Sequence, residues 1–168
     1  MTRFRAAILK RTNQVKWARY IGVRVGDGCR LINVSFSTEP YLVRIGNHVS
    51  ATQTHFETHD GGVWVLRDDD PDIDVIRPIN IGSNVYFGIN CIVLPGVTIG
   101  DNVIVGAGSI VTRDIPAGSV AVGSPARVIK SVEEYRDGVA SKRIPTKRLS
   151  EQAKKRYLLA EWSDTDVP

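Results

Sequence analysis

Apolar residues recur at every sixth position through the second half of the chain. This class of position holds Ile81, Phe87, Val93, Ile99, Val105, Val111 and Ala117. A period of six is neither the 3.6-residue period of an α-helix nor the alternation of a single strand. It requires a short strand and a turn that repeat along the chain. The pattern therefore predicts stacked coils of short strands that bury one column of aliphatic side chains.

The stretch from 81 to 130 carries a family resemblance. Its sequence, IGSNVYFGINCIVLPGVTIGDNVIVGAGSIVTRDIPAGSVAVGSPARVIK, resembles the hexapeptide-repeat acyltransferases, in the branch that contains the maltose, galactoside and xenobiotic acetyltransferases. The resemblance implies an all-β fold, a left-handed parallel β-helix with three hexapeptides per coil. It also implies assembly as a homotrimer.

The extent of the repeat divides the chain into three segments. The β-helix is expected over 21–129, with an extruded loop at 57–77 where the rhythm stops. A basic N-terminal segment, 1–20, precedes it, and a C-terminal tail, 130–168, follows it. In the tail, Ser150 can cap a short helix from about Leu149 to Trp162.

The extruded loop holds the candidate catalytic residue. A loop of this length is costly to order in a regular solenoid and is usually functional. It contains the motif THDGG around His59, which is similar to that of acetyltransferases acting on surface-polysaccharide sugars. Transfer of an acyl group to a hydroxyl needs a base that is neutral near pH 7, and histidine meets that requirement. Because a histidine of this region is the base in the family, we expect His59 to be catalytic.

Four residues near His59 are candidates for binding the acceptor: Glu57, Asp60, Trp64 and His55. Glu57 and Asp60 would accept hydrogen bonds from acceptor hydroxyls or orient the catalytic ring. Trp64 would stack on a sugar ring or, alternatively, pin the loop against a neighbouring subunit. The repeat places His55 at an inward, small-residue position, where its ring needs an internal hydrogen-bond partner.

The resemblance implies acetyl-CoA as co-substrate, bound in a groove between subunits. Family positions that contact it correspond to Ile89, Ala107, Thr112, Arg113, Arg127 and Lys130. Ile89 and Ala107 would act through backbone groups, and Arg127 and Lys130 through the nucleotide phosphates. For Arg113 and Lys130, an ordinary surface charge is the alternative.

A covalent acyl-enzyme is not expected. The repeat places both cysteines, Cys29 and Cys91, at inward positions, where a thiol behaves as a small hydrophobic group. Transfer should therefore be direct, from the thioester to the acceptor, with a backbone N–H stabilising the oxyanion.

The net charge of +4 is concentrated at the two ends of the chain. Residues 1–20 carry +6 and 130–156 carry +5, whereas 21–129 carry −4. Such flanks suit an anionic ligand, a membrane or nucleic acid, but no nucleic-acid-binding motif accompanies them, so we expect no nucleic acid. The first twenty residues would either contact an anionic membrane or only pack on the first coil. No apolar run approaches a membrane span, which predicts a cytoplasmic protein, with a place at the inner face of the membrane left open.

Other functions remain open at this point. The γ-type carbonic anhydrases use the same solenoid, but their zinc is held by histidines spread over several coils. Here His48, His55 and His59 lie in one stretch, so we expect no metal. A non-catalytic scaffold would keep the repeat but has no need of the loop motif. Among acetyltransferases, an amino sugar or an antibiotic is the alternative to a sugar hydroxyl in O-antigen or capsule biosynthesis.

Overall fold

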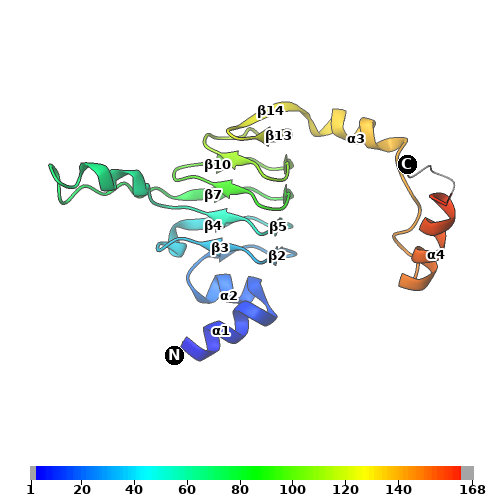
Figure 1. Cartoon of the computed structure of the whole chain (residues 1–168), viewed down its shortest axis with the longest axis horizontal. Helices are drawn as coiled ribbons and strands as arrows, with labels where there is room; N and C mark the ends of the chain where they lie inside the picture. The colour runs from blue at the N-terminus through cyan, green and yellow to red at the C-terminus, as the bar shows by residue number, and fades with distance from the viewer. Residues whose placement is uncertain (1–2, 164–168) are drawn as a thin grey trace. The chain divides into compact units, whose positions relative to one another are not determined.

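The computed structural model describes residues 3–163 and arranges the strands in three sheets (Figure 1). The first sheet contains β1 (Arg24–Val25), β4 (Val43–Ile45), β7 (Ile79–Ile81) and β10 (Thr98–Ile99). The second contains β2 (Arg30–Ile32), β5 (Ser50–Thr52), β8 (Val85–Phe87), β11 (Val103–Val105), β13 (Ser119–Gly123) and β14 (Ala126–Ser131). The third contains β3 (Ser35–Phe36), β6 (His55–Phe56), β9 (Ile92–Val93) and β12 (Ile110–Val111). Residues 1–2 and 164–168, at the ends of the two predicted flanking segments, lie outside the described residues.

The fold is the left-handed parallel β-helix that the family resemblance implies, built from the stacked coils that the repeat predicts. Neighbouring strands pair in parallel, except that β14 is antiparallel to β13. Between the coil of β7–β9 and the coil of β10–β12 equivalent residues are 18 positions apart, as in the pair Tyr86 and Ile104, which is three hexapeptides per coil; in the last coil the spacing falls to 16, as between Ile104 and Val120. In the first two coils the spacing is 20, as between Ser35 and His55.

Left-handed backbone conformations turn the corner between the first and second sheets. His48, Asn84 and Asn102 stack there with φ of 54°, 56° and 56°. The Asn84 Oδ1 lies 2.8 Å from the His48 Nδ1, and the Asn84 amide donates to Asn102 Oδ1 at 2.7 Å. Beside this ladder a Cβ on Gly82 would lie 2.7 Å from the carbonyl carbon of Gly100, so a side chain there would separate the coils. His48 is therefore a corner residue, away from the loop.

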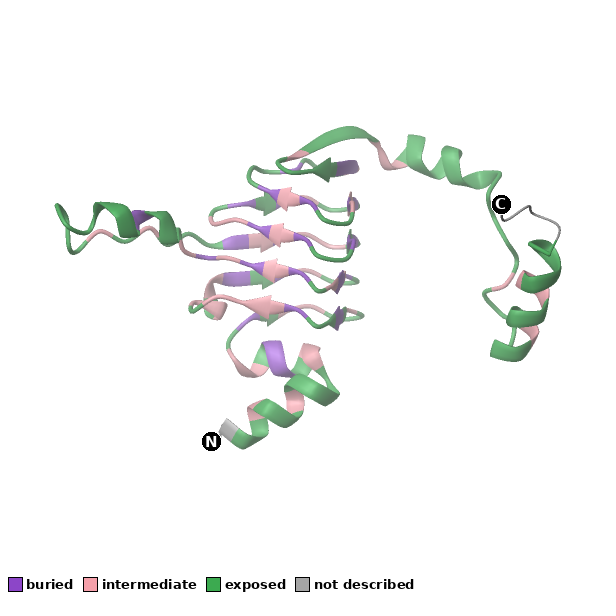
Figure 2. Cartoon of the chain, viewed as in Figure 1, coloured by how far each residue is buried: buried purple, intermediate pink, exposed green. Residues whose placement is uncertain are grey.

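The predicted inward position of His55 is wrong. Between Ala51 and His55 there are four steps along the chain, whereas their partners in the next coil, Phe87 and Ile92, are five steps apart. This corner is one residue short, so Thr54 and Phe56 are the buried residues and His55 is only half-buried. Figure 2 shows the buried residues following the inside of the coils.

Aromatic rings fill the lower interior and connect it to the N-terminal helices. Phe36 stacks on Phe56 at 5.3 Å between centroids, and Phe56 meets Phe87 edge-on at 5.8 Å. Below them lies Trp17, 5.7 Å from Phe36. Trp17 belongs to α2 (Gln14–Tyr20), which follows α1 (Arg3–Thr12) and closes the open end of the first coil. The repeat analysis did not predict these two helices.

The loop interrupting the coils and the C-terminal region complete the chain. Short 3-10 helices, η1 (Pro40–Leu42) and η2 (Gly61–Leu66), lie before β4 and within the loop. After β14 come α3 (Val132–Ala140) and α4 (Glu151–Glu161), and the contacts divide the chain into two units at Tyr135. The predicted C-terminal helix is confirmed, and the Ser150 Oγ caps it by accepting the Ala153 N–H at 3.3 Å.

Candidate active site

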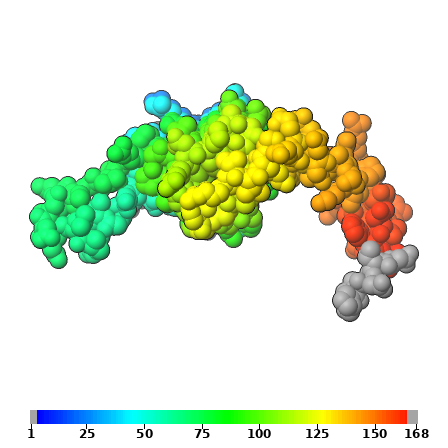
Figure 3. Space-filling model, turned by 90° about the horizontal axis from the view of Figure 1, so that it is seen from above, coloured from blue at the N-terminus to red at the C-terminus, as the bar shows by residue number. Residues whose placement is uncertain are grey.

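The loop leaves the β-helix as a two-stranded stem that holds His59 in place. The Asp60 N–H donates to the Val75 carbonyl and the Arg77 N–H to the Thr58 carbonyl, each at 2.8 Å. The loop projects from the body of the β-helix, and most of its residues are exposed (Figures 2 and 3). Because the stem is hydrogen-bonded on both sides of His59, the backbone from which this ring projects is held in place.

Two carboxylates converge on one nitrogen of His59. Its Nδ1 lies 3.2 Å from Glu57 Oε1 and 3.3 Å from Glu39 Oε2, and the hydrogen-bond geometry is met toward Glu39. The Glu57 Oε1 is buried and has no hydrogen-bond partner among the described residues. The His59 side chain is 35% exposed, and its Nε2 has no partner within residues 3–163. An imidazole whose Nδ1–H is held by carboxylate presents a lone pair on Nε2, which is the arrangement of a general base.

The His55 ring is hydrogen-bonded to the carboxylate of Glu57. Its Nε2 lies 2.9 Å from Glu57 Oε2, and its Nδ1 lies 2.8 Å from the Ser35 Oγ. With the Nε2 proton donated to the carboxylate, Nδ1 accepts from the serine hydroxyl. Both ring nitrogens are therefore used inside the protein, which leaves His55 no free group for the predicted contact with the acceptor.

The repeat analysis missed Glu39. The Glu39 side chain is 13% exposed, and it accepts hydrogen bonds from the hydroxyls of Thr38 at 2.6 Å and Thr58 at 2.8 Å. The signal that locates it is the 20-residue spacing of the first two coils. Because Ser35 pairs with His55 in that register, Glu39 falls under His59.

Both carboxyl groups are held in the ionised form. The hydrogen bond from Thr38 is the main cause that lowers the pKa of Glu39 below its ordinary value of 4.5; burial opposes it, and the bonds from Thr58 and His59 add to the lowering. For Glu57, burial raises the pKa, but the hydrogen bonds from His55 and Ser37 outweigh it and leave the pKa lowered; His59 and His55 lower it further when they are protonated. Two anions therefore face His59 near neutral pH.

These pKa shifts predict an acid-dependent loss of stability. A carboxyl group whose pKa is lower in the folded protein stabilises the fold fully above its unfolded value, and the contribution disappears as pH falls through the folded value. Urea unfolding of the native protein and of Glu39→Gln should therefore differ at pH 6, and the difference should shrink progressively below pH 4.5. A difference that is constant from pH 6 to pH 3 would contradict this assignment.

Asp60 and Trp64 have different surroundings. The Asp60 carboxylate accepts the Gly62 N–H at 2.9 Å and so caps η2. Trp64 is 73% exposed, and the Arg67 guanidinium lies 5.8 Å from the centre of its ring. Trp64 and Arg67 line a pocket on the loop, together with Val65, Asp68 and Pro71. Asp60 thus lies beside the cluster around His59, and Trp64 lies further out on the loop.

The residues predicted to contact acetyl-CoA lie on other edges of the coils. Ile89 and Ala107 occupy the same corner, between the second and third sheets, on successive coils, and both are exposed. Their backbone N–H groups make no hydrogen bond within the described chain. A Cβ on Gly88 would lie 2.4 Å from the Ala107 nitrogen, so a glycine there lets the coils approach. This corner offers unpaired donors to a ligand that carries amide carbonyls.

The other four predicted contacts are exposed and lie at separate places. Thr112 and Arg113 come directly after β12, just as the loop comes directly after β6. They therefore lie at the same corner of the β-helix as the loop, two coils further along. Arg127 and Lys130 lie on β14, where the Arg127 Nη1 donates to the Ala126 carbonyl at 2.8 Å and the Lys130 Nζ lies 5.8 Å from the Tyr135 ring centre. A single chain therefore does not bring the Ile89 corner to His59, because the third sheet lies between them.

Residues 3–163 contain neither a metal-binding cluster nor a membrane-spanning helix. No group of three or more histidine, cysteine, aspartate or glutamate side chains there has an arrangement that would hold a metal ion. None of the helices described has the length and apolarity to cross a membrane.

Comparison with known proteins places the chain among transferases. The model of the family "Bacterial transferase hexapeptide (six repeats)" matches residues 78–113. Protein CapG of Staphylococcus aureus is 46% identical over 161 residues, which cover 94% of each chain. A maltose O-acetyltransferase from Clostridium difficile 630 is 30% identical with a TM-score of 0.54, covering 77% of this chain and 85% of that one. A galactoside acetyltransferase in complex with coenzyme A is 28% identical with a TM-score of 0.58, covering 80% and 82%.

Proposed function

The chain belongs to the hexapeptide-repeat transferases and is an acetyl-CoA-dependent acetyltransferase, and from this premise we propose that it acetylates a sugar hydroxyl by direct transfer. The observation that carries the proposal is the pair of carboxylates at the His59 Nδ1, which leaves Nε2 open toward solvent. The acceptor class is a sugar of surface polysaccharide, such as O-antigen or capsule, consistent with the loop motif.

The proposed mechanism uses His59 as a general base. Its Nε2 takes the proton of the acceptor hydroxyl while the oxygen attacks the thioester carbon. The imidazolium that forms is stabilised by Glu39 and Glu57, which lie within 3.3 Å of the Nδ1 and are ionised at neutral pH. His55 acts through Glu57 as a positioning residue. The C–S bond of the thioester then breaks, and the imidazolium gives its proton to the departing thiolate, so the products are the acetylated sugar and coenzyme A with a free thiol.

Acetyl-CoA supplies the activated acetyl group, and the residues at the Ile89 corner fit it. Unpaired N–H groups at Ile89 and Ala107 suit the amide carbonyls of pantetheine, and either is a candidate donor to the oxyanion. Arg127 and Lys130 would meet the nucleotide phosphates, and Thr112 and Arg113 would complete the binding surface. Asp60 and Trp64 would contact the sugar.

The cysteines support direct transfer. Burial raises the pKa of the Cys91 thiol, and its Sγ lies 3.2 Å from the carbonyl oxygens of Gly88 and Gly106, so it is a poor nucleophile. Cys29 lies in register with the buried Val49 and packs, half-buried, against the core; its Sγ lies 3.2 Å from the Gly46 carbonyl at a corner remote from the loop.

A homotrimer would unite the separated parts. In one chain the donor-binding corner and the loop lie at opposite edges of the third sheet. A closed threefold arrangement would set the corner of one subunit against the loop of the next. We infer that the reaction takes place in the cytoplasm, on a free or lipid-linked sugar; a lipid-linked acceptor would bring it to the inner face of the membrane.

The first test is calorimetric titration of acetyl-CoA into the full chain. We expect binding near one site per chain, and its absence at millimolar ligand would refute the proposed use of acetyl-CoA. Transfer of labelled acetyl to a panel of glycans then tests the acceptor. An ester product is cleaved by hydroxylamine whereas an amide is not, so a resistant product would replace the sugar hydroxyl by an amino sugar.

A further inference from the structure

Helix α1 presents an apolar stripe that nothing in the described chain covers. Ala6 and Leu9 pack against the core of the β-helix. Phe4 and Ile8 are 75% and 47% exposed. At 100° per residue, Phe4, Ile8 and Arg11 share an arc of about 60° on the side of the helix opposite Ala6 and Leu9. The helix therefore uses one face for packing and turns large apolar side chains outward on the other.

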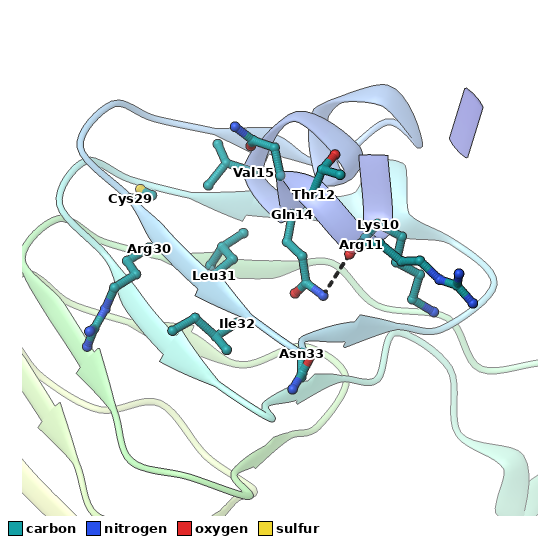
Figure 4. Close-up of a pocket in the computed structure, with 11 residues that line it drawn as sticks. Lys10, Arg11, Thr12, Gln14, Val15, Cys29, Arg30, Leu31, Ile32 and Asn33 are labelled. Atoms are coloured by element: carbon teal, nitrogen blue, oxygen red, sulfur yellow. Dashed lines mark hydrogen bonds between the residues drawn. The ribbon is translucent and has the colours of Figure 1, made fainter. Parts of the chain in front are cut away.

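The same end of the molecule is strongly basic. Residues 1–26 contain no acidic side chain, and the first acid, Asp27, is already paired with Arg19 at 3.1 Å. Arg5 and Arg11 are exposed and have no ionic or hydrogen-bond partner among the described side chains. Lys10 and Arg30 add further positive charge at this end, because both line a cleft between the end of α1 and the first coil (Figure 4). The apolar stripe is thus surrounded by positive charge that is not neutralised locally.

We propose that α1 docks on a membrane surface containing anionic lipid. Positive charge alone would suit any polyanion, and an apolar stripe alone would suit a protein partner. Phe4 and Ile8 flanked by Arg5 and Arg11 fit the interface of an anionic bilayer, where apolar side chains enter the headgroup boundary and cations meet phosphate. With ten residues the helix would lie on the surface, since it is too short to span the bilayer. The inference goes beyond the proposed reaction and does not depend on it.

Sedimentation of the full chain with lipid vesicles tests the docking. We expect the protein to sediment with vesicles of three parts phosphatidylcholine to one part phosphatidylglycerol, and to remain in solution with phosphatidylcholine alone. Retention should weaken as salt is raised, because screening reduces the attraction of exposed cations. Equal retention on both vesicle types, or none on either, would refute an anionic lipid surface.

Paired variants identify the surface that binds. Phe4→Ser with Ile8→Ser, and separately Arg5→Glu with Arg11→Glu, should each weaken vesicle binding at least about tenfold. The matched control is Lys154→Glu with Lys155→Glu in α4, which makes the same change of charge at exposed residues and should bind as the native protein does. Equal acetyl-CoA affinity and unfolding midpoints in all variants would exclude loss of folding as the cause.

Two further outcomes would overturn the proposal. If the α4 variant loses binding while the α1 variants keep it, the contact belongs to the C-terminal cations. If the protein binds a short DNA or RNA duplex but not the vesicles, and the Phe4 and Ile8 substitutions leave that binding unchanged, the basic end is a nucleic-acid surface.

Discussion

Replacement of His59 by alanine is expected to lower kcat by about 10² to 10⁴ while acetyl-CoA binding is retained. The variant removes the Nε2 that accepts the hydroxyl proton but leaves in place the unpaired N–H groups of Ile89 and Ala107, which are proposed to bind the pantetheine chain. Release of the coenzyme thiol, followed continuously with the acceptor found in the glycan screen, measures kcat. Calorimetry measures the affinity for acetyl-CoA.

The matched control for this variant is His48→Asn. His48 occupies a left-handed corner with φ of 54°, and asparagine holds the equivalent position in the next coils at Asn84 and Asn102. Turnover of the control should be unchanged. Glu39→Gln should lower kcat less than His59→Ala does, because Glu57 still faces the ring. Native turnover by His59→Ala would refute the assignment of the base.

Replacement of Phe56 by alanine is expected to destabilise the protein by about 3–5 kcal/mol. The side chain is fully buried and contacts the rings of Phe36 at 5.3 Å and Phe87 at 5.8 Å, so its removal leaves a cavity between two coils. Urea unfolding followed by circular dichroism gives the free energy. Since Phe56 lies in β6 between His55 and Glu57, activity should fall as well.

Phe4→Ala is the control for this prediction, because it removes the same side chain from an exposed position. Its free energy of unfolding should stay within about 0.5 kcal/mol of the native value. A loss below about 1 kcal/mol in the Phe56 variant would contradict this prediction, because it would mean that the coils close over the cavity.

The period of six predicts the β-helix because its inward column recurs without interruption from Ile81 to Val111. The same rule misplaces His55, because one corner is a residue shorter and every later side chain in that coil changes face. Glu39 escapes detection because its link to His59 depends on strand register, which a local motif does not reveal. Helix α2 lacks the repeat and derives its place from Trp17 packing under the first coil.

His59 itself is predictable, since a loop that breaks a regular solenoid and contains a histidine indicates chemistry before any geometry is known. The side chains that surround His59 cannot be predicted from the sequence in the same way. The carboxylate of Glu57 is oriented by His55 and Ser35, whose roles depend on pairing between β3 and β6. The sequence indicates Asp60 as an acceptor ligand but does not reveal that one of its carboxylate oxygens also caps η2 by accepting the Gly62 N–H.

The two ends of the β-helix limit its growth. A stack of parallel strands exposes unpaired backbone at both ends, and identical stacks could add to one another without limit. Helix α2 covers the lower end with Trp17, and at the upper end β14 runs against the direction of every other strand in its sheet. Truncating either element should therefore turn a discrete protein into one that polymerises end to end into fibres.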